Sequence, residues 1–277
     1  HSDEFGILEV GMDKKGEIDN LTKIINPDLG IITNISHAHS KNFKSINQIA
    51  DAKAEIMKNI KENGTIVLNM DDKFYQYHKN FALKKKLKII TFGIKNKYAM
   101  SKLIKVKKKI NNKIELFINI NKLSLSFYTR NKNTSNLYNI LATLASISLY
   151  IDIKNLKKDI FLNLKTPVGR GDISKIKSKN RKFFLIDETY NSNPLSLKTA
   201  IENYDEIQIK ESKKYLILGD MLELGKHSIR QHKLISRVIN KTKINKVYVI
   251  GKYIKETFKN LEKNKKAKIL TNKQGII

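Results

Sequence analysis

Short apolar runs alternate with helix-like segments along most of this 277-residue chain, and that alternation restricts the folds it can adopt. Runs typical of strands occupy 29–33, 65–68 and 87–92, and a segment of helical periodicity lies between the first two. That segment opens with Ser45 and Gln48, a capping-box pattern that marks a helix N-terminus. Strands that alternate with helices form mostly parallel sheets with right-handed crossovers. We therefore predict an α/β fold.

Two further elements are predicted near the start of the chain. Residues 5–10 are mostly apolar and end at Gly11, which is typical of a buried strand. A short helix is expected over 18–25. Ligands of open α/β sheets bind beyond the carboxyl ends of the strands. Glu9, at the end of the predicted strand, would lie at that edge.

The apolar period changes to two over residues 102–128, which predicts a small antiparallel set of strands. Helices are expected next, over 136–150 and 154–164. Proline and glycine within 166–171 then interrupt the pattern, so we place a domain boundary there. Beyond it, strand and helix patterns alternate again, which predicts a second α/β unit with strands at 182–187, 214–219 and 246–250 and helices at 195–209, 228–240 and 252–262.

The formal net charge of +28 suggests a nucleic-acid partner, but the choice of basic residue argues against one. The chain has 49 lysines and five arginines, and the lysines are spread along its whole length. Nucleic-acid sites favour arginine, because its planar guanidinium makes bidentate contacts. We therefore expect no specific nucleic-acid binding.

Composition also limits the setting in which the protein works. Cysteine is absent from the sequence, which excludes disulfides and thiolate metal sites and suits a cytoplasmic protein. No apolar run approaches the roughly 18–20 residues that span a membrane, so we expect no membrane insertion. Hydrophobic residues make up 40% of the chain, enough for folded domains. We expect a monomer.

A histidine and a lysine accompany Glu9 near the predicted sheet edge. His39 lies in the loop after the strand at 29–33, and Lys53 falls on the apolar stripe of the capped helix. Glu9 and His39 could hold a divalent cation, whereas a lysine on an apolar stripe must either snorkel to solvent or serve a site. The alternative is a pair of exposed loop residues and a snorkelling lysine. Spacing alone leaves both interpretations open.

Two asparagines and an arginine offer further polar contacts. Asn136 and Asn139 are three residues apart at a helix start, so their side chains share a face and could read an adenine edge. Asn136 could instead cap that helix. Arg170 lies between two glycines at the domain boundary, where it could contact a phosphate or serve a structural role.

Polar residues also crowd two junctions of the second unit. Residues 187–194 (DETYNSNP) follow a strand-like run and precede a helix-like one, and they carry more carboxylates and amides than a turn requires. Residues 219–225 (GDMLELG) follow the next predicted strand, with His232 beyond them. Asp220 and Glu223 would suit a substrate amine, although a glycine-rich turn with a capping acid is the alternative.

Together these stretches resemble the Mur ligase family, in the family's order and over nearly the whole chain. The combination of YNSNP with GDMLELG is the most specific part of the resemblance. The matching stretches are EVGMDKKGEI (9–18), TNISHAH (33–39), DAKAEI (51–56), NLYNILA (136–142), PVGRG (167–171), DETYNSNP (187–194) and GDMLELG (219–225).

The resemblance implies an architecture and an activity. Residues 1–171 would form the central ATP-binding domain, with part of a mostly parallel sheet and a small antiparallel segment, and residues 172–277 a Rossmann-like α/β domain. The implied enzyme is an ATP-dependent ligase that adds D-alanyl-D-alanine to UDP-N-acetylmuramoyl-tripeptide in peptidoglycan precursor synthesis. ATP would phosphorylate the terminal carboxylate, and the dipeptide amine would displace phosphate from the acyl phosphate. Mg²⁺ would stabilise the developing charge.

The resemblance also implies roles for individual residues. Glu9 and His39 match the family's magnesium ligands, and Lys53 matches a lysine that becomes carbamylated and can then bind a metal. The other matching positions fall in the nucleotide and substrate sites. They are Asn136 and Asn139 near adenine, Arg170 near the nucleotide phosphates, Glu188 near the ribose, and Tyr190, Asn191, Asn193, Asp220 and Glu223 near the substrate.

Two expected motifs of the family are absent from the 277 residues. They are the glycine-rich phosphate-binding loop and a Lys-Gly-Ser-like motif near the C-terminus. We therefore expect an internal fragment of a longer enzyme, inactive by itself. The alternatives are another ligase of the Mur or folylpolyglutamate-synthase type, a non-catalytic binding descendant of the fold, and, with less support, a basic nucleic-acid-binding protein.

Overall fold

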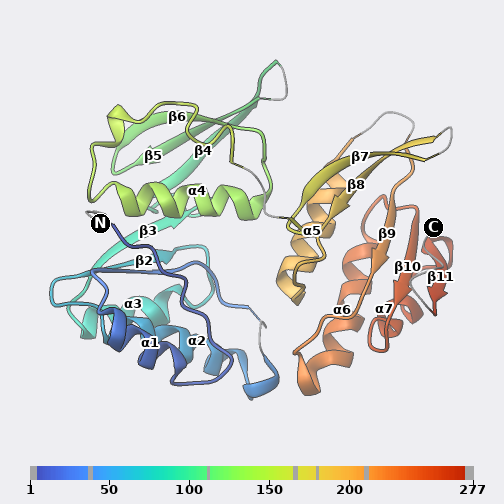
Figure 1. The fold of residues 1–277 in the computed structure, drawn as a ribbon, viewed down its shortest axis with the longest axis horizontal. Coiled ribbons are helices and arrows are strands. Elements are labelled where there is room, and N and C mark those ends of the chain that lie inside the picture. The colour runs from blue at the N-terminus through green and yellow to red at the C-terminus, as the bar shows by residue number, and fades with distance from the viewer. Residues whose placement is uncertain are drawn as a thin grey trace. The chain divides into compact units, whose positions relative to one another are not determined.

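The computed structural model describes residues 5–36, 40–110, 113–164, 168–178, 181–208 and 212–271. Within it the chain divides into two compact units (Figure 1). The first unit comprises His1–Ile35 with Asn42–Leu164, and the second comprises Ser36–Lys41 with Lys165–Ile277. No helix in the described ranges is both long and apolar enough to cross a membrane.

The first unit is built on one six-stranded sheet with the strand order β1-β2-β3-β4-β5-β6. The first four strands pair in parallel and the last three in antiparallel fashion, which confirms the predicted parallel sheet followed by an antiparallel set. The strands are β1 (Leu29–Ile32), β2 (Thr65–Asn69), β3 (Lys88–Gly93), β4 (Ser101–Lys108), β5 (Ile114–Ile120) and β6 (Leu123–Thr129).

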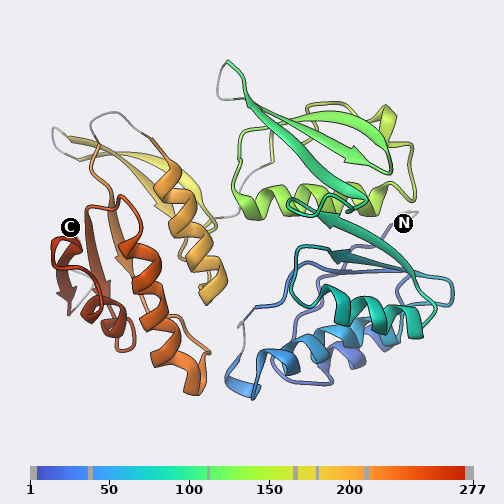
Figure 2. The same ribbon diagram turned by 180° about the vertical axis from the view of Figure 1, so that it is seen from behind.

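Helices cover both faces of this sheet, so its central strand is buried at every residue. On β2, Ile66 and Leu68 pack into one core while Val67 packs into the other, as the alternation of side chains along a strand requires. Helix α4 (Thr134–Ile147) lies on one face, and α1 (Glu17–Ile25), α2 (Ile46–Ala54) and α3 (Tyr75–Lys84) lie on the other (Figures 1 and 2).

Two predictions for the first unit are wrong. Residues 5–10 do not form a strand, and the side chain of Ile7 is 97% exposed. An apolar run forms a strand only where it gains a ladder partner, and β1 pairs with β2 alone among the described strands.

The helix expected over 154–164 is also absent. The chain there makes a single 3₁₀ turn, Ile153–Asn155, capped by Asp152, whose carboxylate accepts from the Lys154 N–H. The carbonyl of Lys158 then accepts from the Tyr128 N–H at 2.6 Å, so this backbone is bound to the edge of β6, and the residues that follow make hydrogen-bonded turns in place of a helix.

The second unit contains a three-stranded parallel sheet with the order β11-β10-β9, made of Lys266–Leu270, Lys246–Ile250 and Tyr215–Leu218 respectively. Helices α5 (Pro194–Glu206), α6 (Ser228–Asn240) and α7 (Lys255–Lys259) pack around a third core. This arrangement confirms a Rossmann-like α/β unit. Helix α7 is shorter than the expected 252–262.

The strand predicted at 182–187 exists but pairs differently from expectation. It is β8 (Arg181–Asp187), and it forms an antiparallel ribbon with β7 (Asp172–Ser178), which the sequence pattern did not indicate. The ladder is complete, from Asp172 opposite Asp187 to Ser178 opposite Arg181. The strand before DETYNSNP therefore ends in this ribbon and not in the parallel sheet.

Candidate functional site

Polar side chains tie together the loops at the carboxyl ends of β1 and β2. Asn69 closes β2, and its side-chain amide donates to the Thr33 carbonyl at 3.0 Å in the loop after β1. Asp72 extends this connection, because its carboxylate accepts from the Ile35 N–H and the Phe74 N–H, each at 2.8 Å. The loop that leads from β1 toward His39 is thus anchored on the end of β2.

Lys53 lies on α2 next to this anchored edge, and its side chain is half-buried. Burial lowers the pKa of Lys53 below its ordinary value, and the negative charge of Asp72 partly opposes that shift. His78 of α3 is a buried neighbour whose pKa is also lowered by burial, and its Nε2 lies 3.1 Å from the Ala50 carbonyl oxygen. The neutral amine of Lys53 is therefore favoured more than in water.

Asp71, in the loop after β2, is hydrogen-bonded to two further elements at the same edge. Its carboxylate accepts from the backbone N–H groups of Ile94, Lys95 and Asn96 at 2.6, 2.9 and 2.8 Å, in the loop after β3. It also accepts from the hydroxyl of Tyr138 on α4 at 3.0 Å. The loops after β2 and β3 and the start of α4 consequently meet at one carboxylate.

The two asparagines of α4 lie near that contact. The N-cap position is Asn133 and not Asn136, so the capping interpretation of Asn136 is wrong. Asn136 lies inside the first turn, and its side-chain amide donates to the Asn131 carbonyl at 2.7 Å. Asn139, three residues further on, is exposed.

The predicted grouping of Glu9, His39 and Lys53 is only partly described. Glu9 is exposed and does not end a strand, because the strand predicted at 5–10 does not form. His39 lies outside the described residues. Within the described ranges, no three His, Cys, Asp or Glu side chains are grouped so that they could hold a metal ion. The metal role of these three residues remains a prediction.

In the second unit, the stretches 168–171 and 187–194 are hydrogen-bonded to each other. The Tyr190 N–H donates to the Gly169 carbonyl at 3.0 Å, and the guanidinium carbon of Arg170 lies 4.3 Å from the centre of the Tyr190 ring. Gly169 has φ +74°, and a Cβ there would lie 2.8 Å from the Tyr190 nitrogen. Glycine is required for this approach, which places Arg170 over the Tyr190 ring.

Acidic residues surround the base of this loop. Desolvation and the negative charges of Asp187 and Asp172 raise the pKa of Glu188, although its side chain retains solvent exposure. Asp172 in turn accepts from the Gly169 N–H at 2.9 Å. Glu188 is consequently more readily protonated than a glutamate free in water.

Asn193 begins α5 as its N-cap. Its side-chain oxygen accepts from the N–H groups of Leu195 and Ser196, and the Ser196 hydroxyl accepts from the Asn193 N–H, which completes a capping box. Asn191 is exposed. The geometry gives Asn193 a structural role, and substrate contact by Asn191 or Asn193 remains a prediction.

The loop after β9 is held by Asp220. Its two carboxylate oxygens accept from the N–H groups of Lys252 and Ile254 at 2.8 and 2.7 Å, in the loop after β10. Nearby, the buried His232 accepts from the Met221 N–H through Nε2 at 2.9 Å, and burial lowers its pKa. His232 is therefore neutral, with its proton on Nδ1 facing the Ser228 carbonyl.

These bonds favour a loop-forming role for Asp220. Contact with a substrate amine remains a prediction for Asp220 and for Glu223, which is exposed and has φ +60°.

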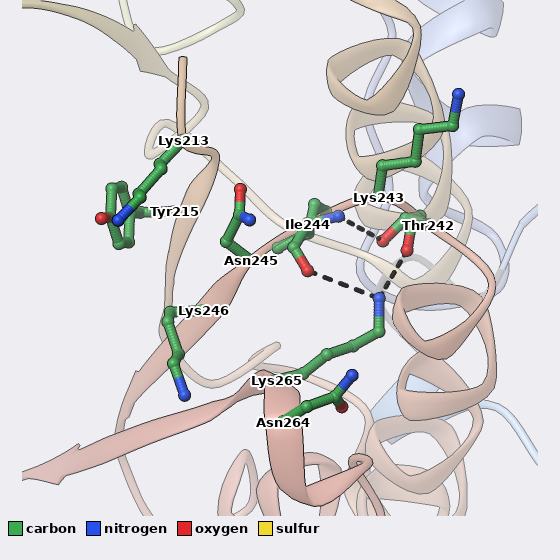
Figure 3. A pocket seen from close by; sticks show the side chains of 9 residues that line it. All are labelled: Lys213, Tyr215, Thr242, Lys243, Ile244, Asn245, Lys246, Asn264 and Lys265. Carbon is green, nitrogen blue, oxygen red and sulfur yellow. Dashed lines mark hydrogen bonds between the residues drawn. The ribbon is translucent and has the colours of Figure 1, made fainter. Parts of the chain in front are cut away.

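A cavity of about 540 Å³ lies at the opposite, amino-terminal edge of the second sheet (Figure 3). Four lysines line it, but their ammonium groups do not converge: Lys243 points away from the others, and Lys265 donates to the carbonyls of Thr242 and Ile244. The buried Lys265 thus satisfies backbone acceptors. Because the ammonium groups do not converge on one point, this cavity does not form an anion site. We therefore place the candidate site at the carboxyl edges of the sheets.

Sequence reasoning missed several residues at the edge in the first unit. Asn69, Asp71 and Asp72 follow directly on the predicted strand at 65–68, so the strand-end rule applied to Glu9 could have found them. His78 and Tyr138 carried no comparable signal, because each lies within a helix and reaches the site only through the fold.

Comparison with known proteins decides the family. Residues 1–147, more than half of the chain, match the Mur ligase middle domain. This chain belongs to the Mur ligase family. The match covers the whole carboxyl edge of the first unit, from the loop after β1 to the end of α4.

Individual Mur ligases resemble the chain in sequence and in structure. A UDP-N-acetylmuramoyl-tripeptide–D-alanyl-D-alanine ligase of Buchnera aphidicola subsp. Acyrthosiphon pisum is 33% identical over 252 residues, which cover 90% of this chain and 53% of the relative. MurF from Acinetobacter baumannii has a TM-score of 0.81 at 22% identity, over 94% of this chain and 54% of that one. MurF ligase from Thermotoga maritima, solved with ADP, has a TM-score of 0.76 at 24% identity, over 95% and 57%. The chain thus spans about half the length of these relatives.

Proposed function

We propose that this chain forms the central and C-terminal domains of an ATP-dependent ligase that joins D-alanyl-D-alanine to UDP-N-acetylmuramoyl-tripeptide. The observation that carries the proposal is a half-buried lysine, Lys53, with a lowered pKa at the carboxyl edge of a Mur ligase middle domain. The name of the 33%-identical relative supports the choice of substrates. Because such a substrate is nucleotide-linked, we place the reaction in the cytoplasm. We also expect the enzyme to be a monomer.

The lowered pKa suits Lys53 to carbamylation. A neutral amine attacks carbon dioxide, an N–C bond forms, and a proton leaves, so a cation becomes an oxygen-bearing anion. Magnesium prefers oxygen ligands, which an ammonium group does not offer. Lys53 fits a magnesium site only in the carbamylated form, and Glu9 and His39 would complete the protein's share of the ligands. Magnesium supplies charge stabilisation for phosphoryl transfer.

The remaining site residues would bind and orient substrates. On α4, Asn136 and Asn139 would face the adenine. Arg170, stacked on Tyr190, would meet a nucleotide phosphate with its guanidinium already fixed in orientation. Glu188 would hydrogen-bond the ribose, and the remaining matches would serve the peptide substrates: Asn191, Asn193, Asp220 and Glu223.

Direct assay tests this function. The chain, expressed with whatever coding sequence flanks it, is incubated with ATP, Mg²⁺, UDP-N-acetylmuramoyl-tripeptide and D-alanyl-D-alanine. We expect phosphate release that requires both peptide substrates, and a product whose mass is their sum minus one water. ATP consumption that persists with a different amino-acid acceptor, and not with D-alanyl-D-alanine, would assign the chain to another branch of the family. No ATP binding and no product would refute the ligase proposal.

A variant of Lys53 tests the site itself. Lys53→Ala is expected to lower turnover by at least about a hundredfold, because the charge stabilisation that the carbamate holds in place is lost. Lys58→Ala is the matched control, since Lys58 is exposed and pairs with Asp19 at 3.3 Å. Nuclear magnetic resonance with ¹³C-labelled bicarbonate should show a carbamate signal in the parent protein and in Lys58→Ala, and none assignable to position 53 in Lys53→Ala. An unchanged spectrum would exclude carbamylation of Lys53.

A further inference from the structure

Tyr138 is the residue of α4 that fastens the helix start to the sheet edge. Its side chain is partly buried, its ring packs edge-on against Phe92 with the centroids 6.4 Å apart, and its hydroxyl donates to Asp71 at 3.0 Å. Burial and the charge of Asp71 raise the pKa of Tyr138 above its ordinary value. The hydroxyl therefore keeps its proton and remains a donor at all physiological pH values.

Contacts that do not involve α4 hold the carboxylate of Asp71 in place. The three N–H groups of residues 94–96 surround its carboxylate, and Gly93 permits the approach, since a Cβ there would lie 3.2 Å from an Asp71 oxygen. A hydrogen bond to a charged, immobile acceptor is stronger and more directional than one between neutral groups. The Tyr138 hydroxyl thus has one favoured position relative to β2 and β3.

Tyr138 lies between the two asparagines assigned to adenine. Successive helix residues are rotated by about 100°, so a side chain that faces the sheet is flanked by Asn136 and Asn139 on other faces of the same turns. A carboxamide reads a base edge only within the narrow distance range of a hydrogen bond. A small slide or rotation of the first turns of α4 would move both carboxamides together.

We propose that the Tyr138–Asp71 hydrogen bond sets the position of the start of α4, and that Tyr138 is a positioning residue for adenine recognition. This inference rests on the proposed function. The later turns of α4 are held separately, because Ile140, Leu141 and Leu144 pack into the core of the first unit. Loss of the Tyr138 hydroxyl therefore leaves the helix folded, but the first turns of α4 are no longer held in one position relative to the sheet.

The variant Tyr138→Phe keeps the ring and removes the hydroxyl. In the chain expressed with its flanking coding sequence, we expect the KM for ATP to rise about tenfold, the worth of one charge-assisted hydrogen bond. The KM for D-alanyl-D-alanine should stay unchanged. The preference for ATP over inosine triphosphate, which differs at the base edge that a carboxamide reads, should fall by a similar factor.

Tyr77→Phe is the matched control. The Tyr77 hydroxyl lies 2.6 Å from an Asp51 oxygen in the same unit, so this variant also loses one tyrosine–aspartate hydrogen bond. It should lower the stability to urea without changing the preference between ATP and inosine triphosphate. A merely structural role for Tyr138 predicts that both variants behave like this control.

Two further measurements make the result decisive. In an Asn139→Ala background, Tyr138→Phe should add little to the loss of ATP preference, because the two act through the same contact. Asp71→Asn weakens the same bond from the other side and also disturbs the N–H contacts of residues 94–96, so it should lower both the ATP preference and the stability to urea. Full ATP preference in a folded Tyr138→Phe or Asp71→Asn protein would overturn the proposal. A parent protein without ATP binding would instead refute the proposed function.

Discussion

At the scale of single residues, carboxylates shape the loops around both candidate sites. Asp71 and Asp220 each accept two or more backbone N–H groups from a neighbouring loop, and Asp72 accepts one from Ile35 and one from Phe74 in its own loop. A carboxylate that receives several N–H donors fixes loop geometry more firmly than an exposed ion pair, because charge-assisted bonds to backbone cost little side-chain entropy in the partner. The loop after β10 packs closely against one of these carboxylates, that of Asp220.

Gly251 is the residue most sensitive to this enclosure. It has φ +136°, and a Cβ there would lie 2.6 Å from the carboxylate of Asp220. Gly251→Ala is therefore expected to lower the free energy of unfolding by about 2–4 kcal/mol, from backbone strain and overpacking combined. Urea unfolding followed by circular dichroism measures the change.

Gly219→Ala is the control for that substitution. A Cβ at Gly219 would meet its nearest heavy atom at 4.0 Å, so the change should cost less than about 1 kcal/mol. Equal effects of the two substitutions would contradict the close approach of Gly251 to Asp220.

At the scale of elements, the capping box of α5 links the loop 187–194 to the helix that follows it. Asn193→Ala removes the acceptor of two N–H groups and should destabilise the protein by about 1 kcal/mol. Asn193→Asp keeps an acceptor oxygen and should restore most of the loss. Asn191→Ala, at an exposed position in the same loop, should stay within about 0.5 kcal/mol of the parent. Thermal and urea unfolding would decide, and a neutral Asn193→Ala would show that the cap is not formed in solution.

The elements also show what the sequence could predict and why. The helix α2 and the strands β2 and β3 were predictable because their apolar periodicity and capping signals are local. The strand expected at 5–10 failed because a strand needs a partner that the run itself does not specify. Helix α3 was not predicted, since its ten residues are mostly polar and only His78 and Ala82 are buried.

In the candidate site, too, features set by local sequence were predictable and features set by tertiary packing were not. The burial of Lys53 was foreseeable from its place on an apolar stripe, because position on a helix face is a local property. The bond between Tyr138 and Asp71 was not, since the two residues are 67 positions apart and meet only when α4 packs on the sheet. The Arg170–Tyr190 contact likewise depends on a glycine conformation that the sequence permits without requiring.

At the scale of the whole molecule, the net charge of +28 opposes compaction, because like charges repel across the surface. Salt screens this repulsion. We therefore expect the free energy of unfolding to rise as sodium chloride increases from about 0.05 to 0.5 M, measured in urea at constant pH. A variant with exposed Lys105, Lys108 and Lys175 changed to Gln should show a weaker salt dependence. A fall in stability with salt would indicate that attractive ion pairs outweigh the repulsion.

The carboxylates that organise the loops have a consequence for how such a lysine-rich sequence can evolve. A bias toward lysine can replace surface residues freely, but Asp71 and Asp220 act as internal ligands of the backbone, where an ammonium group would confront the same N–H donors. We therefore expect that Asp71 and Asp220 cannot be replaced by lysine without loss of the loop structure. In a chain with 26 acidic against 54 basic residues, Asp71 and Asp220 are therefore acids whose negative charge holds backbone loops in place.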